Sequence, residues 1–234
     1  MILEAPTDEG RMDVASEIVR CAKNGDKNGD IALQNLAELY KNHFIRVFYS
    51  SECRTPARSH PSFDIEGCVN AQQAASSNHA KSKHLRSYAA AASVAMLERF
   101  GGIDSIKELD GSNLHRLENA LTLSADIHSW FSDMRIWLER RPEDPPNTYR
   151  PASTKPHVYL VGIPDIVSFS TPDPQRLPLP DPRYLATHAA CARVAHMSGA
   201  AEDIHKVLRD IEETDVLPSD GPSDVLYHAL ARLL

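Results

Sequence analysis

Apolar residues recur every three or four positions along several long segments, a spacing that places them on one face of a helix. This pattern predicts a short helix over residues 11–23 and a long amphipathic helix over 31–48. It also predicts an alanine-rich helix over 87–100, which the Gly101-Gly102 pair would end. Further helices are predicted toward the C-terminus, over 183–199, 200–213 and 222–234. The chain is therefore expected to be mainly helical.

Short apolar or alternating runs between these helices predict a few strands. The runs are 63–65, 119–124, 134–139, 157–162 and 166–170. Prolines are frequent over 142–182, where we expect packed connections rather than a free linker. An α+β fold that is mainly helical, with only short strands, follows from the two patterns together.

Polar residues mark the expected helix boundaries. The turn-rich "KNGDKNGD" (23–30) predicts a linker, with Asp30 as the N-cap of the helix that follows. "IDSIKEL" (103–109) predicts one more helical turn. Ser124 can cap a helix whose first turn contains Asp126, and Ile127, Trp130, Phe131 and Met134 would form the apolar face of that helix.

Composition and charge narrow the class of protein. Of 234 residues, 42% are hydrophobic and 24% are charged, which is typical of a globular chain. No apolar run is long enough for a membrane span, and the acidic N-terminus does not resemble a signal peptide. The four cysteines form no CxxC pair, so an intracellular setting, cytoplasmic or nuclear, is expected. The net charge of −7 does not favour nucleic acid as a partner, although a local basic patch would still allow it.

The candidate chemistry centres on histidines in the middle of the chain. In "LENALTLSADIHSWF" (117–131), His128 near a helix start could bind a divalent ion, and Asn119 could orient a catalytic group or bind the metal through its side-chain oxygen. A general base would come from "SSNHAKSKHLRSY" (76–88), which offers His79 and His84. The same segment contains a cluster suited to phosphate, and His115 lies close to Asn119 in sequence. The cluster residues are Lys81, Lys83 and Arg86.

Three residues of the alanine-rich segment 183–199 are expected to pack in or beside the core rather than to take part in catalysis or metal binding. His188 and His196 lie eight positions apart, hence on nearly the same helix face, and small residues surround them. We expect both to be hydrogen-bonding histidines at the edge of the core. Cys191 is expected to be a small buried residue.

Three segments carry a resemblance to a known family. They are "YAAAASVAMLERFGGI" (88–103), "LDGSNLHRLENALTLSADIHSWFSDMRIWLE" (109–139) and "LPLPDPRYLATHAACARVAHMSGAAEDI" (177–204). Together they resemble the HNH endonuclease domain as it occurs in fungal proteins, over residues 45–234. In this resemblance Asn119 matches the central Asn, His128 matches the final metal-binding His, and either His79 or His84 matches the first His.

The resemblance implies a fold, a division of the chain and a reaction. The fold would be α+β, with a small ββα-metal core of short antiparallel strands. An N-terminal helical region (1–48) would precede an HNH-like domain (49–234), one compact unit with a helical C-terminal extension (178–234). The reaction would be phosphodiester hydrolysis with His79, Asn119 and His128 as catalytic residues. A divalent Mg, Mn or Zn ion would be bound by His128, Asn119 and His84, and the phosphate or substrate by Lys81, Lys83, Arg86 and His115.

Departures from the family pattern support a second interpretation. Ala80 follows His79 where the family has an apolar Ile, and Ser132 follows Phe131 where the family has Asp. With the net charge of −7, these departures favour an HNH scaffold repurposed as an enzyme on a small-molecule substrate, or as a catalytically silent interaction protein. A third interpretation is an interaction module, in which the 31–48 helix and the C-terminal helices form a homodimer.

Overall fold

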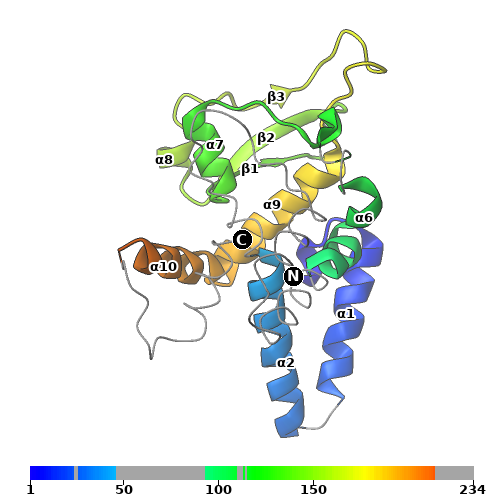
Figure 1. The fold of residues 1–234 in the computed structure, drawn as a ribbon, viewed down its shortest axis with the longest axis vertical. Coiled ribbons are helices and arrows are strands. Elements are labelled where there is room, and N and C mark those ends of the chain that lie inside the picture. Colours follow the sequence, from blue (N-terminus) through cyan, green and yellow to red (C-terminus); the bar gives the residue numbers. More distant parts are fainter. Residues whose placement is uncertain (24–25, 46–92, 110–112, 114, 214–234) are drawn as a thin grey trace, which may run out of the picture.

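The computed structural model describes residues 1–23, 26–45, 93–109, 113 and 115–213 (Figure 1). In this part a small sheet with two short helices lies on one side of the long helix α9 (Pro182–Met197), and a helical hairpin lies on the other. The expected fold class, α+β and mainly helical with short antiparallel strands, is confirmed. No helix among the described residues has both the length and the apolar character needed to cross a membrane.

The hairpin is built from the N-terminal 45 residues. A short 3-10 turn η1 (Ile2–Glu4) leads to α1 (Asp8–Ala22), which Thr7 caps by accepting a hydrogen bond from the Gly10 amide at 3.0 Å. α2 (Asp26–Tyr40) returns alongside α1 and continues as the π-helical turn η2 (Lys41–Ile45). Both predicted helices are therefore confirmed in type.

The start of the second helix differs from the prediction. α2 begins at Asp26, so Asp30 lies inside the helix, and its prediction as an N-cap is wrong. Gly29 explains the earlier start, because a Cβ there would lie only 3.3 Å from the Ala22 carbonyl oxygen. The absence of a side chain lets the first turns of α2 pack directly against the end of α1.

The alanine-rich helix is described from residue 93 and runs to 101. Gly102, with φ +63°, ends it in the left-handed conformation that glycine favours. Gly10 of α1 meets this helix at very close range, since a Cβ at Gly10 would lie 2.6 Å from the Phe100 carbonyl oxygen. The predicted turn that follows is α6 (Ser105–Glu108), capped by Asp104.

The sheet has three antiparallel strands in the order β1-β2-β3. They are β1 (Ile136–Glu139), β2 (Thr148–Ser153) and β3 (Val167–Ser168). β1 and β3 were predicted, whereas β2 was not, because Pro151 argues against a strand. β3 pairs only with Thr148 and Tyr149, so Pro151 has a strand partner on one side alone, where it faces Leu138.

Two strand predictions in this region are wrong. Residues 157–162 contain no strand, because Pro156 starts the short helix α8 (Pro156–Tyr159), a position that suits the fixed φ of proline. Residues 119–124 also form no strand, because Asn119 closes a 3-10 turn η4 (Leu117–Asn119) and no described strand pairs with the chain that follows. The predictions over 63–65 and 222–234 lie outside the described residues.

Helices α7 (Ala125–Ser132), α9 and α10 (Ala200–Glu213) confirm three predictions. Ser124 occupies the N-cap of α7, although its side chain makes no capping hydrogen bond. Gly199, with φ +76°, separates α9 from α10. One cluster of buried apolar residues joins the N-terminal hairpin to β1, α9 and α10, and it includes Val14, Phe44, Phe100, Trp137, Ala192 and Ile204. The expected boundary at residue 48 lies outside the described residues.

The packing roles expected in α9 are confirmed. His188 is buried, donates from Nε2 to the Phe131 carbonyl oxygen at 2.9 Å and stacks on the Phe131 ring. His196 donates from Nε2 to the Met134 carbonyl oxygen at 2.9 Å. Because a carbonyl can only accept, both histidines must carry a proton on Nε2. Cys191 is fully buried.

Candidate functional site

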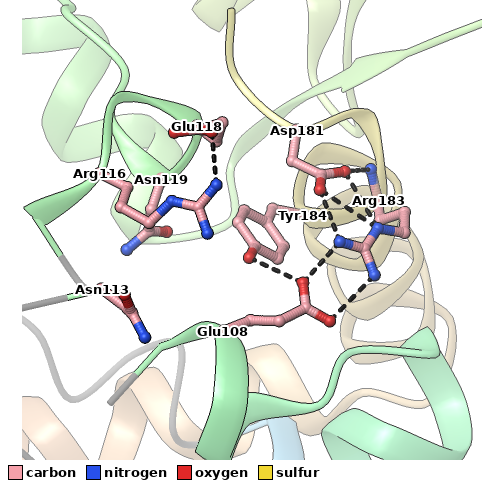
Figure 2. A pocket seen from close by; sticks show the side chains of 8 residues that line it. All are labelled: Glu108, Asn113, Arg116, Glu118, Asn119, Asp181, Arg183 and Tyr184. Carbon is pink, nitrogen blue, oxygen red and sulfur yellow. Dashed lines mark hydrogen bonds and ion pairs between the residues drawn. The ribbon is translucent and has the colours of Figure 1, made fainter. Parts of the chain in front are cut away.

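Asn119 lies at a small polar cleft of about 140 Å³ (Figure 2). Three parts of the chain build the cleft: the end of α6, the turn formed by residues 113 and 115–119, and the start of α9. The lining residues are Glu108, Asn113, Arg116, Glu118, Asn119, Asp181, Arg183 and Tyr184. Of the described residues that were expected to form a site, Asn119 is the one that lines this cleft.

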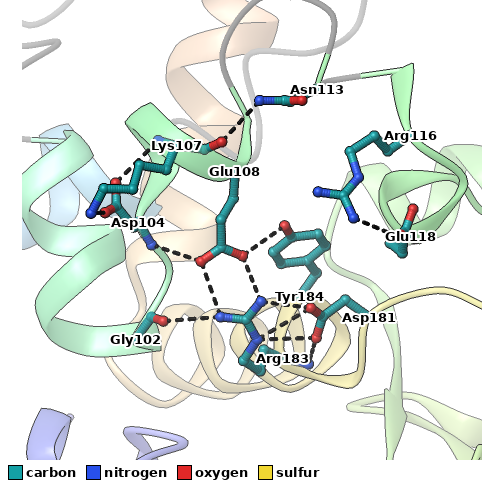
Figure 3. Close-up of polar contacts among 10 residues, drawn as sticks. All are labelled: Gly102, Asp104, Lys107, Glu108, Asn113, Arg116, Glu118, Asp181, Arg183 and Tyr184. Carbon is teal, nitrogen blue, oxygen red and sulfur yellow. Dashed lines mark hydrogen bonds and ion pairs between the residues drawn. The ribbon is translucent and has the colours of Figure 1, made fainter.

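An ion pair between Glu108 and Arg183 closes one side of the cleft (Figure 3). Arg183 donates from Nη1 to Glu108 Oε1 at 3.1 Å and from Nη2 to Oε2 at 2.5 Å, so both oxygens of the carboxylate are engaged. The Tyr184 hydroxyl donates to Oε2 at 3.1 Å, and the Asp104 amide donates to Oε1 at 3.2 Å. These contacts join α6 to the start of α9.

Asp181 links the start of α9 to the turn that contains Asn119. Its side chain caps α9 by accepting from the Arg183 amide at 2.8 Å, and it also binds the Arg183 guanidinium at 2.7 Å. Its backbone amide donates to the Glu118 carbonyl oxygen at 2.8 Å. The position of the 3-10 turn η4 therefore depends on the start of α9.

The opposite wall is formed by the turn itself. Arg116 donates from Nη2 to Glu118 Oε1 at 2.6 Å, and the Arg116 carbonyl accepts from the Asn119 amide at 3.0 Å. Asn113 donates from Nδ2 to the Lys107 carbonyl oxygen at 2.9 Å, which ties the turn to α6. The Asn119 side chain is exposed at this wall.

The protonation states of the cleft are fixed by these pairs. The hydrogen bond from Arg183 lowers the pKa of Glu108. Burial raises the pKa of Asp181, but the hydrogen bonds from Arg183 outweigh burial, so that this pKa also lies below its ordinary value. Burial and then Glu108 raise the pKa of Tyr184 to about 12. Both carboxylates are thus ionised and the phenol is protonated near neutral pH, an arrangement suited to polar recognition rather than proton transfer.

The remaining described candidates do not line the cleft. His128 lies on the exposed surface of α7, and His115 is exposed just before η4, next to the lining residue Arg116. The cleft at Asn119 therefore does not include His128. His79, Lys81, Lys83, His84 and Arg86 lie outside the described residues.

The sequence did not single out the residues that dominate the cleft. Glu108 and Arg183 are 75 positions apart, so no local spacing connects them. One signal was present: Asp181 directly precedes Pro182 in "LPDPRY", a typical N-cap followed by a proline in the first turn. That signal locates the start of α9, but it does not show what the start of α9 contacts.

Comparison with known proteins gives no match to a family model, to a curated protein or to a solved structure. The resemblance to HNH endonucleases therefore stays a hypothesis that rests on the three quoted segments. Within the described ranges, no group of three His, Cys, Asp or Glu side chains is arranged to hold a metal ion. A complete set of three such ligands would need donors from outside the described residues.

Proposed function

We propose that the chain is a homologue of HNH-type metal-dependent nucleases that hydrolyses phosphodiester bonds. One observation supports the proposal. Asn119 ends a turn, residues 120–124 run on without helix or pairing, and α7 then carries His128 on an exposed surface in its second turn. This order of turn, extended segment and helix fits the second half of an HNH motif, although the three described strands all follow α7.

The proposed roles follow from the side chains. His128 would supply an imidazole ligand to a divalent Mg, Mn or Zn ion, and Asn119 would orient the attacking water or supply a side-chain oxygen ligand. His79 would accept the proton of the attacking water, and His84 would be a further metal ligand. In this reaction class a divalent ion neutralises the charge that develops on the phosphoryl oxygens. The described residues supply two of these groups, and the other two belong to residues 46–92.

Plasmid cleavage tests the proposal. The full chain is incubated with supercoiled plasmid and Mg²⁺, Mn²⁺ or Zn²⁺, with EDTA as the metal-free reference. We expect cleavage that depends on the ion, and a rate about 100-fold lower for His79→Ala and for His128→Ala. His157→Ala is a matched control, because His157 is exposed on α8 and outside the three segments. Absence of cleavage with all three ions, or equal cleavage by His128→Ala, would contradict the proposal.

The charge of the cleft favours a second candidate, an HNH scaffold that has become a small-molecule enzyme or a silent interaction protein. Three carboxylates and two guanidinium groups line the cleft that contains Asn119, and both guanidinium groups are paired with carboxylates. A phosphodiester backbone would meet net negative charge there. In this candidate the chain has the HNH fold but does not hydrolyse phosphodiester bonds.

Metal content and DNA binding distinguish the two candidates. Elemental analysis follows dialysis against each ion, and fluorescence anisotropy measures binding to a labelled duplex at low salt. The second candidate predicts less than one ion per chain and no saturable binding of DNA. One tightly bound ion per chain that His128→Ala removes would overturn it.

A further inference from the structure

A second, larger cavity of about 630 Å³ lies beside α9, on the side of the N-terminal segment. It opens to the surface and is lined by residues 3–7 with Arg11, by Gly101, by the end of β1 with Arg140, by Tyr149 of β2 and by one face of α9. Its volume falls within the range of small-molecule sites. Neither Asn119 nor His128 lines it, so an occupant of this cavity is a separate question from the proposed nuclease reaction.

Much of the lining is apolar. The N-terminal segment, β1 and α9 contribute side chains that offer carbon surface and no hydrogen-bonding group. These residues are Leu3, Ala5, Pro6, Leu138, Pro182, Ala186 and Ala189. A ligand with an apolar body would remove this surface from water, which favours binding.

Tyr149 gives the cavity a buried polar group. The residue is 2% exposed, and its hydroxyl has no hydrogen-bond partner among the described residues. A buried hydroxyl without a partner costs free energy, so a ligand that accepts a hydrogen bond from it would gain. A Tyr hydroxyl also prefers to donate to an anion rather than to a neutral oxygen.

Arg140 supplies a cation to the same lining. Arg140 lines the cavity and is exposed, and it forms no ion pair in the described part of the chain. Burial raises the pKa of Tyr149, and the charge of Arg140 acts to lower it whereas that of Asp181 acts to raise it. Arg140 directly follows β1, and Tyr149 lies on β2, which pairs with β1.

The other charged residues of the lining are already paired with each other or with neighbours. Arg193 donates to Glu4 and, at 3.0 Å, to Glu139, and Arg183 is held by Glu108 and Asp181. The carboxylates that pair with Arg11 and Arg183 lie just outside the lining, and they offset these two arginines. Arg140 is the arginine of the lining that has no carboxylate partner among the described residues, so it would attract an anion.

We propose that this cavity binds a small organic carboxylate with an apolar body, its carboxylate held by Arg140 and the Tyr149 hydroxyl and its body lying on Leu138, Ala186 and Ala189. A guanidinium fork matches the two oxygens of a carboxylate, and a single unpaired arginine suits a single negative charge. The ligand would seal the cavity between the N-terminal segment and the sheet.

Titration calorimetry with 2-naphthoate tests the proposal, with 2-naphthalenemethanol as the neutral probe of the same shape. We expect saturable binding of the carboxylate and at least tenfold weaker binding of the alcohol, about the worth of a charge-assisted hydrogen bond. Arg140→Gln should weaken binding of 2-naphthoate about tenfold, and Tyr149→Phe about fivefold. Arg141→Gln is the matched control, because it removes an adjacent exposed charge that does not line the cavity, and it should change the affinity less than about twofold.

A variant that fills the cavity shows whether the ligand binds inside it or only to the surface arginines. Ala186→Leu adds bulk on the cavity face of α9 and should abolish binding while every arginine remains, and circular dichroism would establish that it folds. Equal affinity for the carboxylate and the alcohol, an Arg140→Gln affinity equal to that of Arg141→Gln, or no saturable binding of 2-naphthoate would each overturn the proposal. These readouts do not involve DNA or metal, so they are independent of the nuclease test.

Discussion

Arg183 donates hydrogen bonds to both oxygens of the Glu108 carboxylate, although the two residues are 75 positions apart in the sequence. The pair connects α6 to α9 and forms one wall of the cleft at Asn119. These two helices are far apart in sequence, and we expect this ion pair to stabilise the contact between them.

Removing this pair should destabilise the fold. We expect a coupling energy of about 1 kcal/mol from the cycle of Glu108→Gln, Arg183→Gln and the double variant, a modest value because the Arg183 side chain is 45% exposed. Urea unfolding gives the four free energies. The exposed Arg141→Gln should change stability by less than about 0.5 kcal/mol, and a coupling energy near zero would show that the pair holds nothing together.

His188 should make stability depend on pH in a defined window. Burial lowers its pKa to about 4, against an ordinary value of 6.5, so the unfolded chain binds the extra proton first. This contribution to stability is fully present above pH 6.5, is lost as pH falls from 6.5 to 4, and reaches about 3 kcal/mol. Unfolding by urea across this range measures the slope.

The variant His188→Gln should flatten that slope, because its side chain does not titrate. The contributions of Glu108 and Asp181 are lost as pH falls through the ordinary pKa values of these groups, 4.5 and 3.8, so the slope between about pH 6.5 and 5 reports mainly on His188. An unchanged slope in His188→Gln would mean that other groups cause the acid sensitivity.

Gly10→Ala should destabilise the fold, against the usual effect of this substitution in a helix. Alanine ordinarily favours a helix by about 1 kcal/mol over glycine. Here the new Cβ would lie 2.6 Å from the Phe100 carbonyl oxygen and 2.8 Å from that of Arg99, both backbone atoms. We expect a net loss of about 2 kcal/mol in thermal unfolding.

The matched reference for Gly10 lies in the same helix. Ser16 is exposed on α1, so the difference between Ser16→Gly and Ser16→Ala measures the ordinary preference for alanine there. Opposite signs at positions 10 and 16 are expected. Equal signs would contradict the close contact between α1 and the helix over 93–101.

Thr187→Val should leave stability unchanged or raise it by about 1 kcal/mol. The Thr187 hydroxyl is buried and has no hydrogen-bond partner among the described residues, and valine keeps its shape without the polar group. Thr187→Ala serves as the comparison, because it also removes a buried methyl group and should destabilise. A clear loss of stability in Thr187→Val, measured by thermal unfolding, would indicate that the hydroxyl is paired.

The helices were more predictable than the site because helical periodicity is a local signal. The spacing of Val14 and Ile18 and the small residues around Cys191 located α1 and α9 correctly. β2 is hard to predict because it contains Pro151. Proline is tolerated where a strand lacks a partner on one side, and the sequence of β2 does not show that β3 ends before it reaches Pro151. Asp30 follows a turn-rich segment, which is typical of an N-cap residue. The packing of Gly29 against α1, which local sequence does not show, lets the helix begin earlier.

The cleft was hidden from the sequence for a related reason. The resemblance and the side-chain oxygen of Asn119 point to this residue, and it does line the cleft, but nothing in the sequence points to the residues around it. Its partners come from α6 and α9, and their pairing depends on tertiary packing that no periodicity encodes. The expected association of Asn119 with His128 rests on the HNH resemblance, and His128 is not among the residues that line the cleft at Asn119.

The two histidine bonds from α9 have a consequence for the dynamics of α7. His188 and His196 hold the carbonyls of Phe131 and Met134, at and just beyond the end of α7, whereas α7 itself contains no buried residue. The C-terminal end of the helix is therefore held by α9, and we expect the helix to open first from its N-terminal end. Native-state hydrogen exchange should proceed faster at the amide of His128 than at that of Met134, so the proposed metal ligand would lie at the end that opens first.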